Sequence, residues 1–180
     1  LTALYQPIID FRSQAIFGYE GFIRGPSDSP LHSPHSLLEA AELEGKNSEL
    51  ENICREIVIS QFIALNLPSR LFFNAIPITI ENPKKGAEKT LALLENSDLL
   101  PEDITLEFNE PFPFSDISTM RRAINHYRNI GFSVAFDNLG CSQSSLRNLE
   151  KLSPDFIKID RYYIQGIDQD PQKQNYLLNL

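Results

Sequence analysis

The sequence has no long apolar run and few cysteines. Its longest strongly apolar stretch, residues 57–67, is interrupted by Ser60, Gln61 and Asn66, whereas a membrane-spanning helix needs about 20 apolar residues. The chain opens on strand-like residues, without the basic and apolar segments of a secretory signal. Two cysteines are too few for a disulfide framework. We therefore expect no membrane span in this segment and a cytoplasmic location.

Basic residues are also scarce. The chain carries 16 Lys and Arg against 24 Asp and Glu, which gives a formal net charge of -8. A surface that binds a nucleic acid polymer needs clustered Lys and Arg, so we expect no such partner. A nucleotide bound through a divalent cation is compatible with this charge, because acidic residues in a cleft attract cations first.

The sequence does contain enough apolar residues for one folded domain. Hydrophobic residues make up 42% of the 180 and charged residues 22%, which is typical of a globular protein large enough to bury a core. No internal repeat, low-complexity tract or Gly/Ser-rich linker divides the chain. We predict a single domain over residues 1–180.

Strand-like and helix-like segments alternate along the chain. The first two strand-like segments are separated by only three residues, so they must pair as an antiparallel hairpin. Helix-like segments then fall between strands, which predicts βα units and a mostly parallel sheet. The predicted strands are 3–11, 15–24, 70–76, 104–109, 133–137 and 156–159. The predicted helices are 34–44, 48–67, 82–95 and 115–129, with a last one starting near Asp168.

Six predicted strands are two fewer than a closed (β/α)8 barrel has, and such a barrel typically takes about 250 residues. Two interpretations are open. The chain could be a naturally short open α/β sheet, or a barrel cut before its last βα units. The apolar face of the last helix, with no strand after it, favours the barrel.

Polar side chains recur near the ends of otherwise apolar strands, where barrels of this kind carry active sites. Carboxylate and amide oxygens suit Mg²⁺, Mn²⁺ or Ca²⁺ better than zinc. Taken singly, each residue could instead be a solvated loop residue, a cap, a turn residue or half of a surface ion pair. A bound cation or a lysine would relieve the repulsion between the carboxylates. The residues concerned are Glu20, Asn74, Glu107, Asp137 and Lys158.

Six segments together resemble the EAL domain family in order and spacing. They read YQPIIDF, GYEGFIR, LFFNAIP, ITLEFNE, FSVAFDNLG and SSLRNLEKLSPDFIKIDR. The resemblance runs from Tyr5 to about Ile167. It implies an α/β fold, a (β/α)8 TIM-like barrel with an antiparallel first strand, here lacking its C-terminal βα units. It also implies a bacterial signal-transduction domain that hydrolyses cyclic di-GMP or binds it uncleaved.

The same resemblance assigns roles to single residues. It makes Glu20, Asn74, Glu107 and Asp137 ligands of Mg or Mn, with Asp137 shared between two metal ions. Lys158 matches the lysine that holds the nucleophilic water and the phosphate. Glu110 matches a glutamate that anchors the loop after Asp137. The residues expected to contact the nucleotide are Gln6, Glu20, Phe22, Arg24 and Asp160.

Four departures from the family pattern weaken the expected second metal site or alter the pocket. Asn138 replaces a second aspartate, and Phe22 replaces a leucine that lines the pocket. The loop at 139–143 differs, and the segment with a last metal-binding glutamate is absent. One metal site is then complete and the second compromised, which weakens activation of water and the clamp on the leaving oxygen.

Three functions follow from this pattern. The first is a domain that binds cyclic di-GMP with weak or no hydrolysis. The second is a Mg- or Mn-dependent phosphodiesterase that is active in the full-length protein. The third is a nucleotide-free protein-interaction module. The chain could act as a homodimer or beside a partner domain in a longer chain.

Overall fold

The computed structural model describes residues 1–75, 80–109, 116–139 and 145–179. Six strands form one sheet in chain order, β1 to β6. The first two pair antiparallel and all later neighbours pair parallel, as predicted. The strands are β1 (Thr2–Ile9), β2 (Ile16–Arg24), β3 (Arg70–Asn74), β4 (Ile104–Asn109), β5 (Ser133–Leu139) and β6 (Phe156–Ile159).

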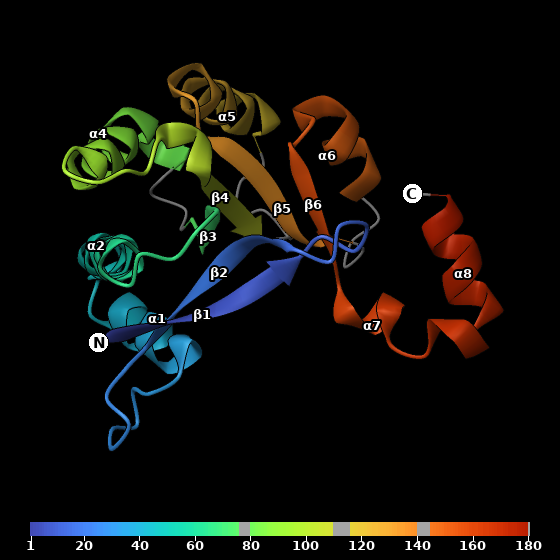
Figure 1. Cartoon of the computed structure of the whole chain (residues 1–180), viewed down its shortest axis with the longest axis horizontal. Helices are drawn as coiled ribbons and strands as arrows, with labels where there is room; N and C mark the ends of the chain where they lie inside the picture. Colours follow the sequence, from blue (N-terminus) through green and yellow to red (C-terminus); the bar gives the residue numbers. More distant parts are fainter. Residues whose placement is uncertain (76–79, 110–115, 140–144, 180) are drawn as a thin grey trace.

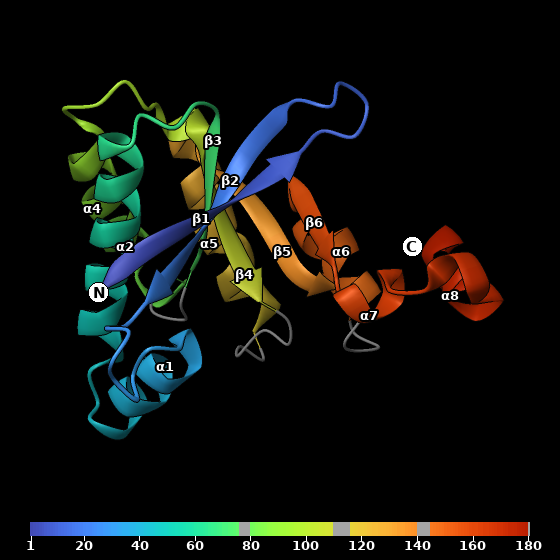
Figure 2. The ribbon, with the colours of Figure 1, turned by 60° about the horizontal axis from the view of Figure 1, so that its bottom comes forward.

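The sheet curls into half of a barrel, with helices along its outer side (Figures 1 and 2). Among the described residues, the helices Ser145–Leu152 and Arg161–Ile164 and two 3₁₀ turns were given no range by the sequence, although a helix between the last two strands is what βα units predict. None of the described helices has the length and apolar character that crossing a membrane requires. The helices are α1 (Pro34–Leu43), α2 (Asn47–Ala64), α4 (Pro83–Leu94), α5 (Ile117–Ile130), α6 (Ser145–Leu152), α7 (Arg161–Ile164) and α8 (Pro171–Leu178). The 3₁₀ turns are Pro101–Asp103 and Ile167–Gln169.

Local signals in the sequence explain where the helices begin and end. The hydroxyl of Ser33 accepts a hydrogen bond from the Ser36 backbone N–H at the start of α1, next to Pro34 in the first turn. The Asp116 carboxylate caps α5 in the same way. Gly131 ends α5 with a φ of 112°, a left-handed conformation that favours glycine.

The two faces of the sheet carry different residues, because successive side chains of a strand point to opposite sides. One face packs its apolar side chains, such as Leu71, Leu106 and Val134, into a core with the buried residues of α2, α4 and α5. On the other face Phe72 packs against Phe156, with ring centroids 5.4 Å apart. Glu107 and Thr105, both buried, also lie on this second face.

Two observed positions refine the predicted strand ends. β5 extends to Leu139, so Asn138 lies inside the strand rather than beyond it. Glu20 lies in the middle of β2, four residues before its end at Arg24. The antiparallel hairpin is therefore longer than the parallel strands around it, and Glu20 is level with Phe72 of β3.

Candidate functional site

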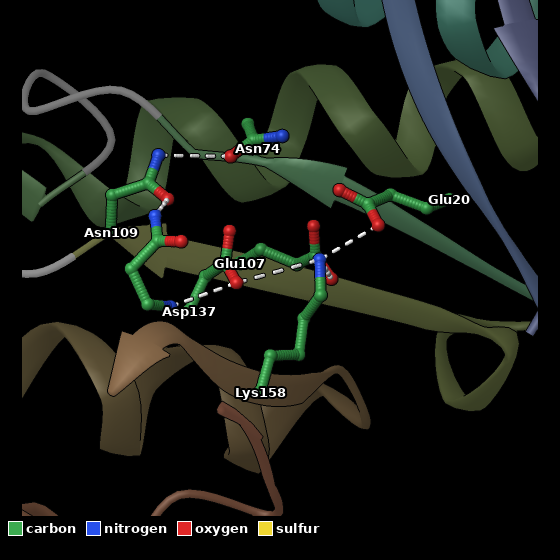
Figure 3. Close-up of polar contacts among 7 residues, drawn as sticks. Glu20, Asn74, Glu107, Asn109, Asp137 and Lys158 are labelled. Atoms are coloured by element: carbon green, nitrogen blue, oxygen red, sulfur yellow. Dashed lines mark hydrogen bonds and ion pairs between the residues drawn. The ribbon is translucent and has the colours of Figure 1, made fainter. Parts of the chain in front are cut away.

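Four of the residues singled out by sequence converge on one point. The Lys158 ammonium lies 2.7 Å from Glu20 Oε2, 3.0 Å from Glu107 Oε1 and 3.7 Å from Asp137 Oδ1 (Figure 3). These side chains come from β2, β4, β5 and β6. The lysine thus neutralises the carboxylates, which was one of the two expected ways of relieving their repulsion. We call these four residues the lysine–carboxylate cluster.

Strand register brings the cluster together. Asn74 of β3 is level with Glu107 of β4, and Asn109 of β4 is level with Asp137 of β5. Glu107 and Asn109 are two residues apart, so their side chains leave the same face of β4. The strands are buried against the helices on their other face, which leaves this register little freedom to slip.

Burial perturbs the charges of the cluster. Burial raises the pKa of Glu107 from 4.5 to about 8, although Lys158 opposes the shift and Glu20 adds to it. Burial would lower the pKa of Lys158, but the negative charges of Glu107 and Glu20 outweigh it and raise that pKa. Lys158 therefore stays in its charged form, whereas Glu107 keeps its proton up to a higher pH than an ordinary carboxyl group does.

The donor set fits a hard divalent cation. Glu107 Oε2 is buried and has no hydrogen-bond partner among the described residues, which is costly for a polar atom unless something else satisfies it. Three carboxylates and the Asn74 amide supply only oxygen ligands, the type that Mg²⁺ and Mn²⁺ prefer. Among the described residues, no three acidic, Cys or His side chains are arranged so that they could hold a metal ion. The carboxylates surround the ammonium of Lys158 instead.

A second arrangement lies beside the cluster and was not predicted. Asn138 Nδ2 donates to Asn109 Oδ1 at 3.1 Å, and Asn109 Nδ2 donates to Asn74 Oδ1 at 3.0 Å (Figure 3). We call these three residues the amide chain. The sequence did hold a signal for it, because the segments FFN, EFN and FDN each place an asparagine close to the end of a strand. Asn109 was missed although it shares a strand face with Glu107.

Three of the residues expected to contact a nucleotide, Gln6, Phe22 and Arg24, lie on the same face of the hairpin as Glu20, which we call the rim. Gln6 is level with Glu20 across the hairpin, and Phe22 is two residues further along β2. The Arg24 guanidinium lies 5.7 Å from the centroid of the Phe22 ring and donates to the Ile23 carbonyl. The Asp160 carboxylate caps α7 by accepting from the Tyr162 backbone N–H at 2.7 Å. Glu110 lies outside the described residues.

A cavity of about 730 Å³ opens beside this rim. Its lining includes Phe22, Asn74 and Asn109 from the strands, and both apolar and charged side chains of α1 and α2, such as Leu37, Val58, Glu51 and Arg55. Its size lies in the range of small-molecule sites.

Comparison with known proteins gives a consistent result. The family model described as "EAL domain" matches residues 1–178. A relative from Escherichia coli K12, "Probable cyclic di-GMP phosphodiesterase PdeB", is 30% identical over 170 residues, which cover 91% of this chain and 32% of the relative. Another from the same organism, "Blue light- and temperature-regulated antirepressor BluF", is 26% identical over 94% of this chain and 41% of its own. The chain thus spans less than half the length of these two relatives.

Solved structures agree with the family match. A standalone EAL protein from Vibrio cholerae O395, in a c-di-GMP-bound form, superposes with a TM-score of 0.89 at 29% identity over 99% of this chain and 73% of its own. The Klebsiella pneumoniae BlrP1 complex with manganese and cyclic di-GMP gives 0.83 at 21% identity over 97% and 44%, a likeness of fold alone. The expected EAL-type α/β barrel fold is confirmed, and six of its strands form the curled sheet seen here.

Proposed function

The chain belongs to the EAL domain family, and from this premise we propose that it binds cyclic di-GMP with weak or no hydrolysis. The observation that carries the proposal is the contrast around Asp137. On one side Lys158 and three carboxylates form a charged cluster. On the other side the Asn138 amide is hydrogen-bonded to Asn109. A carboxylate at 138 would bring a further negative charge for a second cation, and the amide does not.

One Mg or Mn ion is proposed for the first site. Glu20, Asn74, Glu107 and Asp137 would hold it, and when bound it would polarise a phosphate oxygen of the ligand. The buried, unsatisfied Oε2 of Glu107 supports this assignment. Lys158 then has a separate task, because its ammonium is a compact charge on a flexible stem that can turn from the carboxylates to a phosphate.

The remaining contacts are proposed around the rim. Gln6, level with Glu20 on the neighbouring strand, would meet a guanine base. Arg24 would pair with a phosphate, and its place beside the Phe22 ring supports a pre-arranged guanidinium. Asp160 and Glu110 complete the set, the first as a ligand contact and the second as an anchor for the loop after Asp137.

Calorimetric titration with cyclic di-GMP, with and without Mg²⁺ or Mn²⁺, tests this function directly. We expect saturable binding that strengthens with the metal, and we expect it to weaken at least 10-fold in Glu20→Gln, because that change removes one metal-ligating charge. Glu88→Gln is the matched control, since Glu88 is exposed on α4. No heat at high micromolar nucleotide would overturn the proposal.

Hydrolysis is tested separately by following the linear dinucleotide product. We expect little or no turnover by this chain with saturating metal. Turnover typical of enzymes, on the order of 1 s⁻¹ or more, would instead support the active phosphodiesterase, which the name of the PdeB relative also favours.

A protein-interaction module is the other candidate, and the name of the BluF relative, an antirepressor, favours it. In that case the chain would bind a partner or a second copy of itself equally well with and without nucleotide. Light scattering and a binding assay, each with and without nucleotide, separate this outcome from a domain that binds cyclic di-GMP. A cytoplasmic location belongs to all three proposals.

A further inference from the structure

The amide chain joins the ends of three neighbouring parallel strands. Asn74 is the last residue of β3, Asn109 is the last of β4, and Asn138 is next to last in β5. Two hydrogen bonds of 3.1 Å and 3.0 Å link them in series, with Asn109 in the middle as both acceptor and donor (Figure 3). Neither bond is between neighbours in sequence, so each depends on the fold.

Backbone geometry at Asn138 makes the link possible. In a regular strand Asp137 and Asn138 would point to opposite faces of the sheet. Asn138 has a φ of 58°, and the pairing of β5 with β6 shifts register between Phe136 and Leu139. This left-handed conformation turns the Asn138 side chain toward Asn109, on the face that carries Glu107. Asparagine tolerates the conformation better than most residues.

Asn109, the middle residue, orients the side-chain amide of Asn74, the expected metal ligand. Asn74 Oδ1, the oxygen that would face a metal, already accepts from Asn109 Nδ2. The orientation of the Asn74 amide therefore depends on Asn109, and that of Asn109 depends on the donor at Asn138. No charged group takes part in either bond, so the three amides are coupled by direction of donation alone.

We propose that Asn109 is a positioning residue that transmits the identity of residue 138 to Asn74. Residue 138 then acts on the first metal site through the amide chain, and not through a second metal ion. The inference rests on the proposed function only where it concerns metal affinity. The hydrogen-bond coupling between the three asparagines needs neither metal nor nucleotide and can be measured in the protein alone.

Side-chain amide resonances of Asn74 test the coupling in the metal-free chain. Four proteins are compared: wild type, Asn109→Ala, Asn138→Gly and the double variant. Glycine is chosen at 138 because it accepts the left-handed φ without strain. We expect Asn138→Gly to shift the Asn74 Nδ2 resonances in the wild-type background and to leave them in place once Asn109 is alanine.

Asn125→Ala is the matched control, an asparagine exposed on α5. It should leave the Asn74 resonances unchanged. If Asn138→Gly shifts Asn74 equally in both backgrounds, or in neither, the proposal is overturned whether or not the protein binds nucleotide.

Mn²⁺ affinity, followed by the paramagnetic resonance of the free ion, gives the functional readout. A single hydrogen bond that orients a ligand corresponds to a change of about 2- to 10-fold. We expect Asn109→Ala and Asn138→Gly each to weaken Mn²⁺ binding by that factor, and the double variant to be no weaker than Asn109→Ala. Additive losses would overturn the coupling. Absence of Mn²⁺ binding in every protein would instead contradict the proposed metal site, and the resonance test would still decide the role of Asn109.

Discussion

The lysine–carboxylate cluster and the amide chain lie side by side and share the strands β4 and β5, but different interactions hold them together. The cluster gathers three carboxyl groups around one ammonium, and Glu107 in it is fully buried. The amide chain is neutral and its members are half-buried or exposed. Asp137 belongs to the first and Asn138 to the second, so one step along β5 separates a charged site from an uncharged one.

This difference shows what a single carboxylate-to-amide change does. Two carboxylates about 4 Å apart repel by roughly 4 kcal/mol at an effective dielectric near 20, so each added charge needs a counter-charge. The cluster meets that need with Lys158 and with a proton on Glu107, whose pKa is about 8. An amide needs neither. The strand end around Asn138 can therefore be stable without a cation.

The largest effect is expected when the ammonium is removed. Lys158→Met leaves Glu20, Glu107 and Asp137 facing one another without a positive charge. We expect the free energy of unfolding at pH 8, without metal, to fall by about 2–4 kcal/mol, less than for a fully buried pair because the cluster is partly solvated. Urea unfolding measures it.

The same variant should recover at pH 5, where the carboxyl groups can take up protons and their repulsion falls. Lys173→Met, a change of the same kind in α8 away from the cluster, is the control. An equal loss at both pH values would mean that lost packing of the lysine stem, and not charge, explains the effect.

Much of the fold and the charged cluster could be predicted from the sequence, whereas the amide chain had only the asparagines near three strand ends as a signal, which does not show that they are hydrogen-bonded. The hairpin, the parallel strands and the convergence of Glu20, Glu107, Asp137 and Lys158 follow from apolar periodicity and from polar residues that interrupt it. Lys158 as the counter-charge was one of two open possibilities. The amide chain depends on strand register and on a left-handed φ at Asn138, and neither leaves a periodic trace in a sequence.

The next largest expected effect is a dependence of folding stability on pH that Glu107 alone should produce. Its folded-state pKa of about 8 lies above its ordinary value of 4.5. Between these values the folded chain keeps a proton that the unfolded chain has lost, so stability is full below about pH 4.5 and falls as the pH rises toward 8. We expect a loss of a few kcal/mol across this window, since one pKa unit corresponds to about 1.4 kcal/mol.

Glu107→Gln removes that proton exchange. In buffers with a chelator, the difference in stability between wild type and Glu107→Gln should grow in favour of the variant from pH 5 to pH 8. Parallel stability curves for the two proteins would contradict the raised pKa.

A smaller effect is expected at the boundary between the two regions. Asn138→Asp tolerates the same backbone conformation and adds a charge next to Asp137, but it also removes the donor to Asn109 Oδ1, because a carboxylate only accepts. The added attraction should outweigh this lost bond, so we expect a net rise in Mn²⁺ affinity of about 3-fold, and a fall in metal-free stability at pH 8. Calorimetry and urea unfolding measure the two quantities. A loss of affinity like that of Asn138→Gly would show that the charge at 138 does not reach the cation.

The smallest effect is expected inside the amide chain. Asn109→Ala breaks both hydrogen bonds, yet its partners Asn74 and Asn138 can turn to water, because Asn74 and Asn109 are exposed and Asn138 is half-buried. We expect the free energy of unfolding to fall by less than about 1 kcal/mol, since an unmade hydrogen bond is costly only where water cannot replace it. Asn125→Ala gives the reference for losing an exposed amide. A loss as large as that of Lys158→Met would contradict the distinction between the two regions, because it would mean that the amide chain holds the strand ends together as strongly as the charges do.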